Sequence, residues 1–142
     1  MKPVCLVMGA GAGIGGTVGT RFANEGYHAV LCRRSDEDGL NRMVASIESE
    51  GGSASGFLVN AVEPEVIEDR VATVEKDIGP IEVVVFNLGA QIGDRALKDT
   101  SYKAFEMGWR MATFALFRIA QAVTPHMAER AKGTILVTSA TA

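Results

Sequence analysis

A run of glycines near the N-terminus is the part of the sequence best suited to bind a ligand. The run Met-Gly-Ala-Gly-Ala-Gly-Ile-Gly-Gly lies between a short apolar run and a helical pattern. Glycines let the backbone approach a ligand closely, and a helix N-terminus behind them offers free N–H groups to a diphosphate. Gly11, Gly13 and Gly16 match the dinucleotide-binding pattern G-x-G-x-x-G, whereas Gly9, Gly13 and Gly15 match G-x-x-x-G-x-G. The alternative is a strand-to-helix turn that binds no ligand.

Two arginines, Arg33 and Arg34, follow the second predicted strand, at residues 28–32. In a nucleotide-binding βαβ unit, the end of this strand lies beside the adenosine ribose, where a basic side chain accommodates a 2′-phosphate. Guanidinium groups can also form bidentate contacts with a phosphate dianion. The sequence therefore favours NADP(H) over NAD(H). Alternatively, both arginines are solvated charges that pair with the acidic residues at positions 36–38.

Apolar periodicity predicts the elements that would position these residues. We expect strands at 2–8, 28–32, 54–59, 81–87 and 134–139, and helices at 14–24, 36–50, 64–78 and 102–130. In the first helix, Ile14 is expected on the apolar face. The last helix, from Tyr102 to Arg130, is expected to bend at Pro125. Alternation of strands and helices predicts an α/β fold with a parallel sheet covered on both faces, in one domain over residues 1–142.

Composition narrows the classes of partner. The chain has 142 residues, 47% of them hydrophobic, and a net charge of −3, so it offers little basic surface to nucleic acid or to an anionic membrane. The most apolar later stretch contains Glu106, Arg110 and Arg118, too many charges for a lipid-spanning helix. Cys5 and Cys32 each lie in an apolar run, which indicates reduced core cysteines and a cytoplasmic location.

Three motifs, in this order along the chain, resemble those of the short-chain dehydrogenase/reductase family. They are Gly9-x-x-x-Gly13-x-Gly15, Phe86-Asn87-Leu88-Gly89 where the family has Asn-Asn-Ala-Gly, and the run from Gly133 to Ser139. The resemblance implies a Rossmann-type, doubly wound parallel sheet in three α/β/α layers, here truncated after the fifth strand. It also implies a nicotinamide cofactor and hydride transfer to or from a small carbonyl or alcohol substrate.

The same resemblance implies a role for individual residues. Ser139 would be the catalytic serine, although another register places Ala140 there. The end of the third strand would touch adenine, and the segment after the fourth would line the adenine and ribose side and brace the centre of the sheet. The implied cofactor-binding residues are Gly9, Gly11, Ala12, Gly13, Ile14, Gly15, Arg33, Arg34, Asn60, Ala61, Val62, Asn87, Leu88 and Gly89.

The sequence also departs from the family pattern. Met8 replaces a Thr whose hydroxyl would tie the glycine turn to the loop after the fourth strand, and Ala112 stands where an Asn supports a proton relay. The family's proton donor is a Tyr followed four residues later by Lys, but Tyr27 and Tyr102 are not followed by Lys at this spacing. The chain alone is therefore expected to be an inactive piece of a longer enzyme.

Two other functions remain open at this point. One is a non-catalytic nucleotide-binding or interaction module that kept the fold and lost the chemistry. The other, a methyltransferase or a different glycine-loop α/β protein, fits the first turn but not the Asn87-Leu88-Gly89 segment.

The helix from Tyr102 to Arg130 has apolar residues on more than one face, which predicts a second buried surface. In the resembled family this helix pairs with its copy in a neighbouring subunit, which implies a homodimer or homotetramer. Alternatively, the surplus apolar side chains cover the sheet edge or contact further chain.

Overall fold

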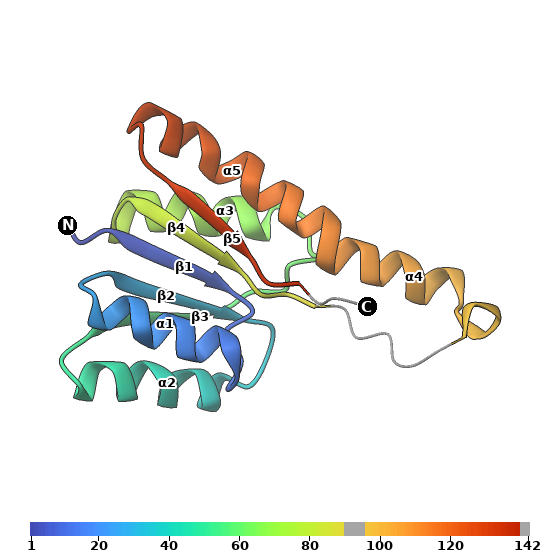
Figure 1. Ribbon diagram of the computed structural model, residues 1–142, viewed down its shortest axis with the longest axis horizontal. Coiled ribbons are helices and arrows are strands. Elements are labelled where there is room, and N and C mark those ends of the chain that lie inside the picture. The colour runs from blue at the N-terminus through green and yellow to red at the C-terminus, as the bar shows by residue number, and fades with distance from the viewer. Residues whose placement is uncertain (90–95, 140–142) are drawn as a thin grey trace.

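The fold is a five-stranded parallel sheet with helices on both faces (Figure 1). The computed structural model describes residues 1–89 and 96–139. The strand order is β3-β2-β1-β4-β5, and every pairing is parallel. The strands are β1 (Val4–Met8), β2 (His28–Arg33), β3 (Ser53–Leu58), β4 (Ile81–Phe86) and β5 (Thr134–Val137). The predicted Rossmann-type, three-layer α/β/α sheet is therefore confirmed.

The helices form two outer layers. On one face, α1 (Ile14–Asn24) and α2 (Glu37–Ser49) pack against the sheet, and on the other lie α3 (Val66–Thr73) and α5 (Ala115–Glu129) (Figure 1). α3 continues as a π-helical turn, Val74–Ile78. Before α5 come a 3-10 turn (Leu97–Asp99), α4 (Tyr102–Trp109) and a second π-helical turn (Arg110–Phe114). All four predicted helical regions are present, with ends shifted by a few residues.

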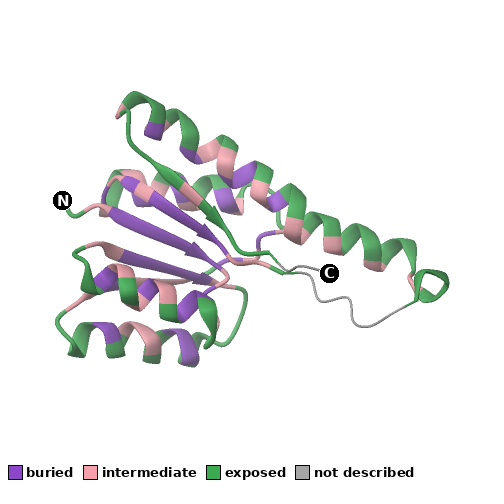
Figure 2. Ribbon diagram, viewed as in Figure 1, coloured by how far each residue is buried: buried purple, intermediate pink, exposed green. Residues whose placement is uncertain are grey.

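The core divides between the two faces of the sheet because side chains alternate along each strand. Leu6 and Val84 belong to the cluster under α3 and α5, whereas Val7 and Val85 belong to the cluster under α1 and α2. The three central strands are buried on both faces, as Figure 2 shows, whereas most of β5 is exposed.

Two details differ from the sequence-based expectations, namely the exposure of Ile14 and a π-helical turn in the long helix, whereas Pro125 lies inside the helix as predicted. Ile14 does not join the apolar core and is 61% exposed, because it begins α1 at the open end of the sheet. α5 continues through Pro125 to Glu129. The carbonyl of Gln121, which loses its usual N–H donor there, belongs to an exposed residue and can be hydrated. The long helix departs from α-helical hydrogen bonding at the π-helical turn Arg110–Phe114, between α4 and α5.

Cys5 and Cys32 are buried free thiols, as expected for core packing. Burial raises the pKa of each thiol to about 12, so both stay protonated near neutral pH. Among the described residues, no helix is both long and apolar enough to cross a membrane.

Candidate functional site

The turn between β1 and α1 has no room for a Cβ at Gly9, at Gly15 or at Gly16, where it would lie 2.6 Å from the carbonyl oxygen of Gly11. Gly9 has a φ of +92°, and a Cβ there would lie 2.5 Å from the carbonyl oxygen of Asn87. A Cβ on Gly15 would overlap the carbonyl oxygen of Gly9. By contrast, a Cβ on Gly11 or Gly13 would meet no described atom within 4 Å. The turn is thus packed tightly on its inner side and is open on its outer side.

Free amide groups line this open turn. Gly13 is the N-cap of α1 and supplies no side-chain cap. Over the ranges that the structure describes, no acceptor bonds the backbone N–H of Ala12, Gly13, Ile14 or Gly15. Unpaired N–H groups at a helix N-terminus, together with the helix dipole, form a site for an anion. The geometry therefore fits a diphosphate, as the glycine pattern predicts.

The end of β4 holds the turn in place. Asn87 Nδ2 donates to the carbonyl oxygen of Gly9 across 3.0 Å, and the Asn87 N–H donates to the carbonyl oxygen of Met8 across 2.8 Å. The Thr138 hydroxyl donates in turn to Asn87 Oδ1 across 2.7 Å. Asn87 therefore braces the centre of the sheet, and it ties the turn down although Met8 has no hydroxyl.

Leu88 and Gly89 extend from this brace. Leu88 is half-buried and packs against the core under α3 and α5. Gly89 is exposed, and a Cβ there would meet no described atom within 4 Å. The segment after β4 thus lies directly against the glycine turn.

The two predicted arginines at the end of β2 differ in environment. Arg33 is half-buried and pairs with Asp36, with 3.5 Å between Nη1 and Oδ2. The alternative expectation, that the arginines pair with acidic residues at positions 36–38, is therefore realised for Arg33. Asp36 is also the N-cap of α2, where its Oδ1 accepts from the Gly39 N–H. Arg34 is exposed.

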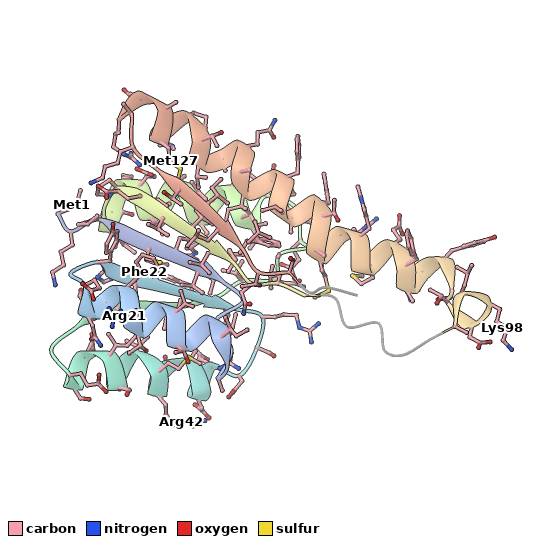
Figure 3. All side chains as sticks on the ribbon, in the orientation of Figure 1. Met1, Arg21, Phe22, Arg42, Lys98 and Met127 are labelled. Atoms are coloured by element: carbon pink, nitrogen blue, oxygen red, sulfur yellow. The ribbon has the colours of Figure 1, made fainter. Side chains whose placement is uncertain are left out.

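A cavity of about 420 Å³ between α1 and α2 opens next to Arg33. Arg42 on α2, labelled in Figure 3, also contributes to its lining. The other lining residues are Ala12, Gly16, Thr17, Thr20, Asp36, Gly39, Met43 and Ser46. Ala12 of the glycine turn and Arg33 therefore line the same cavity.

The segment after β3 forms the far side of the site. Asn60 Oδ1 accepts from the Val62 N–H across 3.4 Å, and Asn60 Nδ2 donates to Glu63 Oε1 across 3.2 Å. Ala61 is buried, and its carbonyl oxygen accepts from Arg118 Nη1 across 2.8 Å. The contact with Arg118 was not predicted. A charge on the apolar face of the helical pattern was the signal that could have revealed it.

The structure brings the four predicted segments, which follow β1, β2, β3 and β4, to one edge of the sheet. β1, β2, β3 and β4 are parallel neighbours, so the segments that follow them meet at their carboxyl ends, where ligands of open α/β sheets bind. Residues 3–142 match the family described as short chain dehydrogenase. The chain belongs to the short-chain dehydrogenase family.

Relatives of known activity support this assignment. The chain is 35% identical over 132 residues to gluconate 5-dehydrogenase of Gluconobacter oxydans, covering 92% of the chain and 50% of that protein. A crystal structure of an actinorhodin polyketide ketoreductase variant with NADPH has a TM-score of 0.87 and 29% identity, covering 96% of the chain and 52% of that structure. The structure of 7α-hydroxysteroid dehydrogenase with NADH has a TM-score of 0.89 and 25% identity, covering 97% of the chain and 53% of that structure. The chain spans about half the length of these relatives.

The residues expected to perform short-chain dehydrogenase chemistry are only partly in place. Ser139 follows β5 and is exposed, while the alternative position, 140, lies outside the described residues. Tyr27 packs edge-on against Phe22 before β2, at the opposite end of the sheet from the glycine turn. Tyr102 is 96% exposed at the start of α4. Tyr27 therefore lies away from a ligand at the carboxyl ends of the strands, and neither tyrosine is followed four residues later by Lys.

Two further observations bear on short-chain dehydrogenase chemistry. Ala112 lies within the π-helical turn Arg110–Phe114, where the resemblance leads us to expect an Asn. A methyl group cannot take part in the proton relay that this Asn supports. Across residues 1–89 and 96–139, no group of three or more His, Cys, Asp or Glu side chains could hold a metal ion.

Proposed function

We propose that the protein containing this chain is an NADP(H)-dependent oxidoreductase and that residues 1–142 bind its dinucleotide. The observation that carries the proposal is the set of N–H groups from Ala12 to Gly15, which have no acceptor among the described residues and belong to a turn that shares a cavity with Arg33. When bound, the nicotinamide supplies or accepts a hydride. The proposed substrate is a small carbonyl or alcohol, in line with the family to which the chain belongs.

Each segment has a separate task in this proposal. The N–H groups of Gly13 and Ile14 hold the diphosphate, and Asn87 keeps the turn in position. Asn60, Ala61 and Val62 lie against the adenine, and Leu88 with Gly89 lines the side facing the ribose. Ser139 orients the reacting oxygen of the substrate at the end of β5.

The preference for NADP(H) rests on charge. Arg33 and Arg34 both lie at the end of β2, and within the described part of the chain only Arg33 has an acidic neighbour at ion-pair distance, 3.5 Å away. A 2′-phosphate dianion would compete well for a guanidinium that is held this loosely by Asp36. The two solved relatives contain different cofactors, NADPH and NADH. The preference is therefore inferred from this chain alone.

A non-catalytic module is the second candidate, and Ala112 favours it. The proposed enzyme needs an acid to protonate the developing alkoxide. Tyr27 lies at the opposite end of the sheet from the glycine turn, and neither Tyr27 nor Tyr102 has a Lys four residues later. In this second candidate the chain binds the dinucleotide as a ligand and transfers no hydride.

A second copy of the protein is the proposed partner. Aromatic side chains project from α4 and the first turns of α5 on the side away from the sheet (Figure 3). Phe105 is 67% exposed and Phe117 is 59% exposed. Such a surface is typical of a homodimer or homotetramer interface.

Titration with NADPH, followed by cofactor fluorescence, tests the proposal. We expect saturable binding that is weakened by inorganic pyrophosphate, which competes for the glycine turn. NADH should bind more weakly than NADPH. Absence of binding at millimolar NADPH would refute the proposal, whereas binding without turnover on a panel of ketones, aldehydes and alcohols would favour the non-catalytic module.

A further inference from the structure

A buried arginine on α5 holds the segment that follows β3. Arg118 is 9% exposed, on the face of α5 that packs toward the core. Its Nη1 donates to the carbonyl oxygen of Ala61 across 2.8 Å, and its Nη2 donates to the carbonyl oxygen of Glu63 across 3.0 Å. These two carbonyls flank Val62. One side chain therefore fixes both sides of a short turn.

A carboxylate completes the coordination of this guanidinium. Arg118 Nε donates to Glu68 Oε1 across 2.9 Å, and Arg118 Nη2 donates to Glu68 Oε2 across 2.7 Å. The hydrogen bonds from Arg118 hold the pKa of Glu68 below its usual value. Burying a charged side chain is costly unless partners of this kind surround it. The same position could hold an apolar residue if the helix had only to cover the sheet.

Without Arg118, the turn would have core packing at Ala61 but only local hydrogen bonds. Among the described residues, its other hydrogen bonds are those from the Val62 N–H and the Glu63 N–H to Asn60 and the one between the Asn60 and Glu63 side chains, all within four consecutive residues. Bonds within so short a segment shape a turn but do not anchor it to the rest of the protein. Arg118 supplies that anchor from a helix more than 50 residues further along the chain.

The anchored turn lies next to the cofactor site in the sheet order. The Val59 N–H donates to the carbonyl oxygen of Arg33 across 2.8 Å, so the end of β3 is joined to the end of β2. A dinucleotide whose diphosphate lies on the glycine turn and whose ribose lies near Arg33 extends its base toward the next strand end. Asn60 to Val62 follow that strand.

We propose that Arg118 is a positioning residue for the adenine side of the cofactor: by holding the carbonyl oxygens of Ala61 and Glu63, it keeps the turn from Asn60 to Val62 in the shape that receives the base. This inference rests on the proposed function. The proposal assigns Arg118 no contact with the ligand, because four of its five N–H groups already donate to Ala61, Glu63 and Glu68.

The test compares two ligands on one variant of the protein that contains this chain. Arg118→Lys keeps the charge but cannot reproduce the planar fork that reaches two carbonyls and a carboxylate. The affinity of the variant for 2′,5′-ADP, which contains the adenine, should fall by about tenfold, equivalent to roughly 1.4 kcal/mol. Its affinity for inorganic pyrophosphate, which needs only the glycine turn, should stay unchanged. Both affinities can be measured by displacement of NADPH or by calorimetry.

Arg130→Lys is the matched control. Arg130 also forms a two-pronged pair, with Glu75, and donates to a backbone carbonyl, that of Ile81. Ile81 begins β4, at the opposite end of the sheet from the cofactor site. Arg130→Lys should therefore lower the free energy of unfolding through the loss of similar contacts. It should leave the affinity for 2′,5′-ADP unchanged.

The outcomes separate the two proposals. If the parent protein binds neither NADPH nor 2′,5′-ADP, the proposed function fails and this inference fails with it. If the parent binds NADPH and 2′,5′-ADP, the positioning role is wrong in two cases. In one, Arg118→Lys weakens the binding of 2′,5′-ADP and of pyrophosphate equally. In the other, it weakens the binding of neither. Should Arg118→Lys not fold, Arg118→Met replaces it, because Met fills much of the same space but donates to neither carbonyl, and the part-exposed Glu68 can then be hydrated. An unchanged affinity of Arg118→Met for 2′,5′-ADP would then overturn the inference.

Discussion

The side-chain amide of Asn87 donates a hydrogen bond to the carbonyl oxygen of Gly9, 78 residues earlier in the chain. The bond joins the end of β4 to the turn after β1, the two strand ends at the centre of the sheet. Because the Asn87 Oδ1 also accepts from Thr138, one side chain ties three strand ends together. The glycine turn is thus held by the neighbouring strand ends as well as by its own sequence.

Replacing Asn87 with Ala should loosen the turn. The part-buried hydrogen bond to the Gly9 carbonyl is lost, and only the Gly11 N–H still donates to that oxygen, at a cost of about 1 to 2 kcal/mol in the free energy of unfolding. Urea denaturation measures this cost, and NADPH affinity should fall with it. Asn41→Ala, on the exposed side of α2, is the control and should change neither quantity.

Two glycines of the turn should respond differently to the same substitution. The methyl group of Gly15→Ala would overlap the Gly9 carbonyl, and since the obstacle is backbone, the free energy of unfolding should fall by roughly 1 to 3 kcal/mol. In Gly11→Ala the methyl group meets no described atom within 4 Å. That variant should keep the parent's melting temperature. Equal destabilisation of both variants would contradict the geometry of the turn.

The charge at the end of β2 should determine the choice of cofactor. Arg33→Gln removes the guanidinium proposed to meet the 2′-phosphate, so NADPH affinity should fall by about tenfold or more while NADH affinity stays the same. Because the contact is ionic, added salt should weaken NADPH binding to the parent more than to the variant. A parallel loss of affinity for both cofactors would show that Arg33 supports the fold rather than selecting the phosphate.

Much of this arrangement could be predicted from the sequence, and the failures have physical reasons. The parallel sheet with helices on both faces follows from buried apolar runs alternating with helical patterns, and the glycine turn follows from its place between β1 and α1. Arg118 was missed because a charge within a helical pattern is usually solvated, whereas here Ala61, Glu63 and Glu68 surround it. The π-helical turn at Arg110–Phe114 was missed because one extra residue per turn leaves no clear mark on apolar periodicity.

His28 should make the stability of the fold depend on pH. Its ring nitrogens lie within hydrogen-bonding distance of the hydroxyls of Ser53 and Ser55, and burial, with the charge of Lys2, lowers its pKa below the usual value of 6.5. The unfolded chain therefore binds a proton at a higher pH than the folded one. The free energy of unfolding should fall as pH decreases below about 6.5.

His28→Gln removes this titration and should flatten that part of the pH profile. Urea denaturation at pH 8, 6.5 and 5.5 measures the effect on parent and variant. At pH 8, His28 is neutral in both the folded and the unfolded state of the parent. The difference in stability between parent and variant at pH 8 therefore does not contain the protonation of His28. A variant whose stability falls as steeply as the parent's between pH 6.5 and 5.5 would rule His28 out as the source.

The exposed aromatic face of α4 and α5 should control the assembly of the protein. Phe105 and Phe117 are exposed, whereas Ile119 and Val123 of the same long helix are fully buried against the sheet. A double substitution of Phe105 and Phe117 by Ser removes apolar surface that the fold does not use, so the monomer should stay folded and its melting temperature should change little. Light scattering should then show a shift from dimer or tetramer to monomer. A parent protein that is already monomeric at high concentration would exclude this face as a self-association surface.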